Sequence, residues 1–264
     1  MPNRTIAKFS TFVILAVASV VLGACGHTLS GGSGSTAIDG GESPFSPSGQ
    51  VGTLESAFIK ESSGLIVSKC QPNVFWTHND SGDDAFIYAF ADDGRHLGTW
   101  RVSGARNIDW EDMASTKDAD GCRLYIGDIG SYGKKRGQGT VYRVKEPVTT
   151  PESIDYDKNN PLTTEAAEVL HFTYESKYDA ETLAVNPKTG DIYVISKRKD
   201  GPAAVYKMQP LFGNQPVRAE RVAELSVPGV PEGLITGGDI SSDGTRIVLC
   251  DYVAGYELTL PAGS

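Results

Sequence analysis

A pair of short apolar strands recurs four times along the chain, and this repeat restricts the fold more than any other feature. The second strand of each pair carries a tyrosine, namely Tyr88, Tyr142, Tyr206 and Tyr256. Successive tyrosines lie 54, 64 and 50 residues apart, which suits one propeller blade with loops of variable length. Helical periodicity is weak throughout. The pattern predicts an all-β chain folded as a β-propeller of four-stranded blades.

The paired strands are expected to be the second and third strands of each blade. They are predicted at 74–76 with 86–88, 124–126 with 140–142, 192–194 with 204–206, and 247–249 with 255–257. A further apolar stretch before each pair predicts the innermost strand, at 64–67, 112–114, 182–185 and 238–240. Alternating stretches such as 98–102 and 168–172 predict the outer strand.

The two ends of this region raise the question of how the ring closes. Residues 50–59 have no inner strands before them, so they are predicted to be a lone outer strand that completes the last blade. The sequence stops at Ser264, just after the third strand of the fourth unit. Either 50–59 closes a four-bladed ring directly, or a fifth blade is missing.

Residues 1–24 have the composition of a bacterial export signal. Arg4 and Lys8 precede an apolar run over 12–22 that is short for a transmembrane helix. Residues 22–25 read Leu-Gly-Ala-Cys, the pattern at which lipoprotein signals are cut and the cysteine is acylated. We predict an exported protein with lipid on Cys25, anchored to the outer face of the bacterial cell membrane or in the cell envelope. The alternative is an ordinary secretory signal cleaved nearby.

Composition divides the rest of the chain into a tether and one domain. Residues 25–49 are rich in Gly, Ser, Thr and Pro, as flexible linkers are, and 50–264 form the predicted propeller domain. The net charge of −9 becomes −11 once Arg4 and Lys8 leave with the signal. Such a charge argues against nucleic acid and anionic lipid surfaces as partners, so contact with the membrane is expected only through the lipid.

Three cysteines follow the tether. Cys70 and Cys122 each precede an apolar strand in successive repeats, so outside the cytoplasm they are candidates for a disulfide between neighbouring blades. Cys250 lies within an apolar strand and is interpreted as a core thiol.

Carboxylates gather in the loops that enter the innermost strands. In a propeller these loops, and those joining the second and third strands, emerge on one face around the central channel. The candidate metal ligands are Glu61, Asp109, Glu111, Asp179 and Glu181. The three glutamates are interpreted as matching positions in three blades, with the aspartates two residues earlier. Their repulsion would be relieved by Ca²⁺, by nearby basic residues or by raised pKa values.

The loops between the second and third strands supply a candidate ligand site. Its residues are His78, Asn79, Asp80, Asp128, Lys197 and Arg198. Two alternatives stay open here. Asp80 and Asp128 lie in turn sequences, where each would only accept hydrogen bonds from nearby backbone amides, and His78 would be a hydrogen-bonded structural residue.

Several of these motifs together resemble a family of exported bacterial β-propeller lipoproteins, most of them uncharacterised. The resemblance covers 56–260 and is carried by Trp-Thr-His-Asn-Asp-Ser-Gly at 76–82 and Asp-Trp-Glu-Asp at 109–112. It implies five blades in the complete fold. Ser131 and Tyr132 depart from it, because an acidic residue and an amide often stand there. The Asp-Ala-Glu at 179–181 is more loosely similar to phytase-like and esterase-like propellers that hold calcium.

These observations lead to three hypotheses about function. The first is a binding module that holds a divalent cation and a small polar or anionic ligand at the channel mouth. The second is a calcium-assisted hydrolase of a phosphate ester or lactone, with a carboxylate positioning water. The third is a scaffold for an envelope protein. Whether the protein is an enzyme stays open, although the sequence lacks the nucleophile-elbow, phosphate-loop and zinc-helix motifs.

Overall fold

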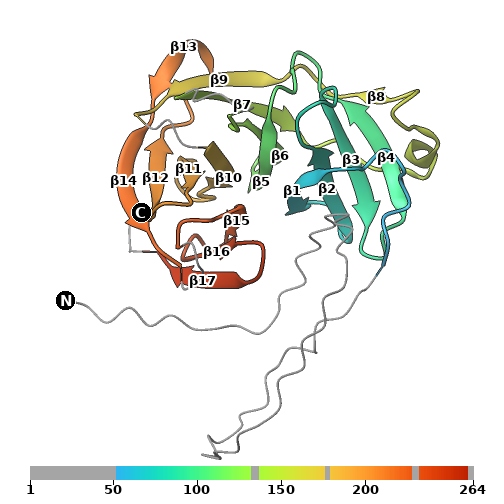
Figure 1. Ribbon diagram of the computed structural model, residues 1–264. Coiled ribbons are helices and arrows are strands. Elements are labelled where there is room, and N and C mark those ends of the chain that lie inside the picture. The colour runs from blue at the N-terminus through green and yellow to red at the C-terminus, as the bar shows by residue number, and fades with distance from the viewer. Residues whose placement is uncertain (1–51, 132–136, 176–178, 228–231, 261–264) are drawn as a thin grey trace, which may run out of the picture.

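Four antiparallel sheets stand in a ring, as the repeat predicts, and form a four-bladed β-propeller (Figure 1). The computed structural model describes residues 52–131, 137–175, 179–227 and 232–260. The predicted signal, Cys25, the whole predicted tether and Tyr132 lie outside the described residues. No helix in the described ranges is long and apolar enough to cross a membrane.

The strands of the first two blades follow the predicted order. Blade 1 comprises β1 (Ser62–Val67), β2 (Val74–Asn79), β3 (Phe86–Ala91) and β4 (His96–Arg101), with the short β8 (Leu162–Thr163) parallel to β4. Blade 2 comprises β5 (Trp110–Asp118), β6 (Gly121–Asp128), β7 (Gln138–Lys145) and β9 (Glu168–Thr173), with β13 (Gly213–Arg218) parallel to β9. A short 3-10 helix, η1 (Pro151–Asp155), lies against β4.

The last two blades differ at their outer edge. Blade 3 comprises β10 (Asp179–Val185), β11 (Ile192–Lys197), β12 (Ala203–Met208) and β14 (Glu220–Leu225). Blade 4 comprises β15 (Gly237–Ile240), β16 (Arg246–Cys250) and β17 (Gly255–Thr259). No strand among the described residues pairs with the outer edge of β17, so this blade has three strands where the others have a fourth.

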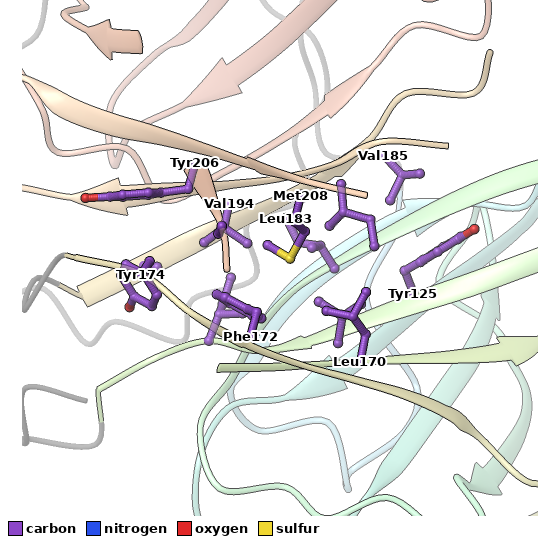
Figure 2. Packing of buried hydrophobic residues seen from close by; sticks show 14 of the residues in the cluster. Tyr125, Leu170, Phe172, Tyr174, Leu183, Val185, Val194, Tyr206 and Met208 are labelled. Atoms are coloured by element: carbon purple, nitrogen blue, oxygen red, sulfur yellow. The ribbon is translucent and has the colours of Figure 1, made fainter. Parts of the chain in front are cut away.

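The core lies between the blades rather than within them, because side chains alternate between the two faces of each strand. Three hydrophobic clusters join blade 1 to 2, 2 to 3, and 3 to 4. Figure 2 shows the middle cluster, where Leu170 and Phe172 of β9 face Leu183 and Val194 of blade 3. All four repeat tyrosines lie in the third strand of their blade and are buried, as the pattern predicts.

The prediction that 50–59 closes the last blade was wrong for the described part, 52–59. This segment forms no strand, and several of its hydrogen bonds go to blade 1. Glu55 N donates to Gly94 O at 3.0 Å, and the Asn79 amide donates to Phe58 O and accepts from Lys60 N. The β3–β4 turn and Asn79 thus provide these backbone groups with partners on blade 1, away from β17.

A disulfide between Cys70 and Cys122 links blades 1 and 2. Their Cα atoms are 6.0 Å apart, within the usual range for this bond. Cys250 is a free thiol in β16, and burial raises its pKa to about 11.

Candidate metal centre

The starts of the innermost strands and the ends of the second strands meet at one face of the ring. Ser62 pairs with Asn79, Trp110 with Asp128, and Asp179 with Lys197. This face, here called the carboxylate face, therefore carries the loops in which the sequence analysis placed both candidate sites.

A β-bulge near the start of the innermost strand changes the direction of side chains in three of the blades. It lies between Trp110 and Asp112 in blade 2 and between Ala180 and Thr182 in blade 3. Glu111 and Glu181 are the extra residues of these bulges. A bulge leaves one residue out of the regular alternation, so that its side chain can leave the face of the sheet.

The predicted equivalence of Glu61 with the two other glutamates was wrong. In blade 1 the bulge falls between Ser62 and Leu65, so the position matching Glu111 is Ser63. Glu61 instead matches the aspartates two residues earlier in their blades, and it is exposed. Ser63 Oγ donates a hydrogen bond of 3.3 Å to Glu111 Oε2. The first blade thus contributes a hydroxyl where the next two contribute a carboxylate.

Four carboxylates from three blades surround Glu111, so that the cluster holds five in all. One group unites Asp80, Asp109 and Glu111, and a second unites Glu111, Asp179 and Glu181, each with one carboxylate oxygen per residue within 4.8 Å of the others. Glu111 belongs to both groups and is 6 % exposed. Four of these residues were predicted metal ligands. Asp80, predicted as a ligand-binding residue, belongs to the cluster, whereas the predicted metal ligand Glu61 does not.

The backbone of the neighbouring loop comes unusually close to this cluster. A Cβ atom on Gly130 would lie 2.3 Å from Glu111 Oε1 and 2.4 Å from Asp109 Oδ2. Gly130 N also donates to Asp109 O at 3.1 Å, which fixes the loop against the start of β5. A larger residue here would force the two carboxylates or the loop to shift.

Burial and mutual repulsion shift the titration of the cluster. Burial, followed by the charges of Glu181, Asp80, Asp109 and Asp179, raises the pKa of Glu111 to about 10. Burial also raises the pKa of Glu181, to about 7, although the ammonium of Lys197 opposes this shift. Lys197 Nζ donates to Glu181 Oε1, and this contact raises the pKa of Lys197. Near neutral pH, Glu111 therefore holds a proton.

The remaining predicted ligand-binding residues have structural partners. His78 is fully buried and packs edge-on against Trp110 with ring centroids 5.4 Å apart, and burial lowers its pKa to about 4. Asp128 is buried and accepts from Asp109 N at 3.2 Å. Arg198 Nε donates to Asp200 at 3.1 Å. These contacts favour the structural alternative for His78 and Asp128, while Lys197 lies at the cluster.

Two further acids, which the sequence analysis did not single out, lie deeper in the ring. Asp112 accepts from the backbone N of Met113 and of Leu183, and burial raises its pKa well above the ordinary value. Desolvation raises the pKa of Asp239 to about 6, opposed by the Lys69 ammonium 4.0 Å away. Asp112 is the residue after Glu111 in β5. Because successive side chains of a strand point to opposite faces, the sequence could have placed Asp112 on the other face of β5 from Glu111.

A cleft of about 460 Å³ lies between the β2–β3 loop and the end of β4 in blade 1 and the loop that enters blade 2. Its lining includes Asp84, Arg101, Arg106 and Asn107. Arg101 pairs with Asp84 at 3.7 Å, and the Asn107 amide donates to the backbone oxygen of Asp80 at 2.9 Å. Asn107 therefore connects the wall of the cleft to the loop that carries one of the five carboxylates.

No protein-family model and no curated protein matches the chain. Among solved structures, extracellular domains 1–2 of Drosophila semaphorin 1a are 7 % identical, with 77 % of this chain and 57 % of that chain covered and a TM-score of 0.43. The β-propeller domain of Myceliophteria thermophila Cps50 (Swd1) is 6 % identical, with 76 % and 54 % covered and a TM-score of 0.39.

A chain of the mitotic checkpoint complex is 10 % identical, with 80 % of this chain and 52 % of that chain covered and a TM-score of 0.39. The chain thus spans about half the length of these structures. Similarity at this level carries no argument about function.

Proposed function

We propose that this propeller is a binding module that holds a divalent cation, Ca²⁺, on its carboxylate face and uses it to bind a small anionic or polar ligand. The cation would be held by the cluster described above: Asp80, Asp109, Glu111, Asp179 and Glu181. A propeller fold suits such a role, because its loops from several blades converge on one channel mouth.

The burial of Glu111 among four other carboxylates is the observation that supports this proposal. Like charges so close together raise the free energy of the folded protein unless a proton or a cation compensates them. Lys197 compensates one charge through Glu181. The rise of the Glu111 pKa to about 10, caused by burial and by the neighbouring carboxylates, supports a compensating positive charge at this point. A proton meets that need without a metal, and a divalent cation would displace it.

The donor set favours a hard cation. All five side chains offer carboxylate oxygens, the ligand type that Ca²⁺ prefers with a coordination number of six to eight. Two groups with oxygens within 4.8 Å share Glu111, so a single ion near this residue would draw ligands from three blades. The thiolate and imidazole ligands typical of zinc are absent from both groups.

A cation in this position would also attract an anion. Carboxylate or phosphate oxygens commonly complete the coordination of Ca²⁺. The neighbouring cleft contains Arg101 and Arg106, whose guanidinium groups suit the same anions. We propose that the ligand bridges the cation and this cleft. Lys197, at the end of β11 in blade 3, contacts Glu181.

The location that we propose follows from the N-terminal sequence. The export signal over 1–24 and the lipid on Cys25 would hold the propeller at the bacterial envelope, with the acidic domain facing away from anionic lipid.

Calorimetric titration of the purified protein with CaCl₂ tests the cation site. We expect saturable binding of one ion, lost in Glu111→Gln/Glu181→Gln and kept in Glu165→Gln, which changes an exposed glutamate outside the cluster. A titration with inorganic phosphate, with and without CaCl₂, then tests the anion site. Calcium binding unchanged in the double variant would rule out the cluster as the site.

A further inference from the structure

The disulfide lies at the face of the ring opposite to the carboxylate face. Cys70 follows the end of β1, and Cys122 is the second residue of β6. Because β1 and β5 start at the carboxylate face, the turns after them lie at the other face. Any chemistry at this disulfide is therefore independent of the proposed cation site.

The two cysteine residues differ in their exposure to solvent. Cys70 is exposed, whereas Cys122 is 3 % exposed. Thiol–disulfide exchange requires that a thiolate reach one sulfur atom, and access decides which sulfur is attacked. In the folded protein an external thiolate would reach Cys70, so the buried Cys122 would be the leaving group.

A buried carboxyl group lies beside this disulfide. A carboxylate oxygen of Glu146 is within 4.8 Å of both sulfur atoms, and the residue is 6 % exposed. Its Oε1 accepts from Gln71 Nε2 at 2.7 Å and from Trp76 Nε1 at 3.0 Å. The backbone N of Glu146 donates to Cys122 O at 2.9 Å, which holds Glu146 beside the strand of the buried cysteine.

The second oxygen of this carboxyl group, Glu146 Oε2, is buried and has no hydrogen-bond partner among the described residues. A buried acceptor without a donor raises the free energy of the state that contains it. The disulfide has no proton to donate. A reduced cysteine carries an S–H donor, so reduction of Cys122 would supply the missing partner.

We propose that Cys70 and Cys122 form a thiol–disulfide exchange centre for an external dithiol, with Glu146 as the proton acceptor of Cys122. A thiolate of the dithiol attacks Cys70 Sγ, the bond between the two cysteines breaks, and Cys122 leaves with the electron pair. Cys122 takes up the proton that the attacking thiol released and donates it in a hydrogen bond to Glu146.

The second thiol of the reagent then completes the exchange. It attacks the reagent's own sulfur in the mixed disulfide and releases Cys70 as a thiol, so that the protein gains two electrons and two protons and the reagent becomes a disulfide. In the reverse direction Glu146 removes the proton of Cys122, and the resulting thiolate attacks the mixed disulfide at Cys70.

Reduction of the purified protein by dithiothreitol, followed by acid quenching, alkylation and mass spectrometry, tests the proposal. We expect Cys70 and Cys122 to be reduced in the folded protein, much faster than the protein unfolds under the same conditions. With oxidised glutathione, Cys122→Ser should form a mixed disulfide at Cys70, and Cys70→Ser should form none at Cys122. Reduction only at the rate of unfolding, or glutathione on Cys122, would overturn the proposal.

The variant Glu146→Gln tests the role of the carboxyl group. The amide keeps an acceptor for Trp76 and Gln71 but accepts no proton. We expect closure of the glutathione mixed disulfide to slow about tenfold at pH 7, with the difference from the unmodified protein shrinking as pH approaches the thiol pKa. Glu146→Asp should recover part of the rate. An unchanged rate and pH profile in a folded Glu146→Gln protein would contradict the assignment.

Discussion

Glu111 and Glu181 occupy the same bulge position in neighbouring blades and bring carboxylate oxygens within 4.8 Å of each other. This relationship follows from the repeat. Blades 2 and 3 have the same β-bulge at the channel mouth, and the extra residue of each bulge is a glutamate. Neither residue could relax into the regular alternation without a shift in strand register, which would turn the core side chains outward.

Gly130→Ala should disrupt the cluster. The added methyl group would lie closer than 3 Å to both Glu111 and Asp109, so the loop or the carboxylates must move. We expect calcium affinity to fall at least tenfold while the protein remains folded, as measured by calorimetry and circular dichroism. The matched control is Gly104→Ala, because a Cβ there meets no atom within 4 Å, although its φ of +82° adds local strain.

Calcium binding should release protons. Glu111 is protonated near neutral pH because its pKa is raised to about 10, and Glu181 is partly protonated because its pKa is raised to about 7. A cation that binds their carboxylates must displace these protons. Titrations in buffers of different ionisation enthalpy at pH 7 should show release of about one to two protons per ion. Apparent affinity that falls as pH rises from 6 to 9 would contradict this prediction.

The stability of the metal-free protein should depend on pH through Glu111. A carboxyl group with a raised pKa binds its proton more tightly in the folded state, so its contribution to stability is lost as pH rises from about 4.5 towards 10. In EDTA, Glu111→Gln should therefore gain stability relative to the unmodified protein between pH 5.5 and pH 8.5, measured by urea unfolding. Glu165→Gln should show no such trend.

The tyrosine repeat has a measurable consequence beyond packing. Tyr88 donates to Asp83 at 3.0 Å and Tyr256 donates to Asp251 at 2.7 Å, each five residues earlier, so the third strand is tied to the loop before it. A hydrogen bond to a charged group contributes about 1.5–3 kcal/mol. Tyr88→Phe should lower the free energy of unfolding by about this amount. A loss below about 0.5 kcal/mol would show that Lys158 and Asn79 satisfy Asp83 without it.

Much of the fold could be predicted because each blade repeats the same short-range pattern. Apolar runs bounded by Gly, Asp and Asn identified the three inner strands of every blade, and the buried tyrosines fixed the third. The weaker strands β8, β13 and β14 were not predicted. Two of them, β8 and β13, pair in parallel with strands of an earlier blade, and such pairing depends on long-range contacts rather than on local alternation.

Closure and the exact site were harder to predict for a physical reason. Residues 52–59 were assigned to an outer strand because no inner strands precede them, but the Asn79 amide and the β3–β4 turn bind their backbone groups. Glu61 was aligned by residue type, whereas the bulge in blade 1 places Ser63 opposite Glu111. The convergence of Asp80 on the same cluster depends on how the blades are arranged around the ring, which spacing along one chain does not specify.

The measurement that tests the cation site most directly is the melting temperature of the purified protein in EDTA and in millimolar CaCl₂. A ligand at one hundred times its Kd stabilises by about 2.7 kcal/mol, which corresponds to a rise of roughly 5–10 °C for a domain of this size. We predict such a rise, absent in Glu111→Gln/Glu181→Gln and present in Glu165→Gln. An unchanged melting temperature in a protein that unfolds cooperatively would contradict the account, and the five carboxylates would then serve the structure through protonation alone.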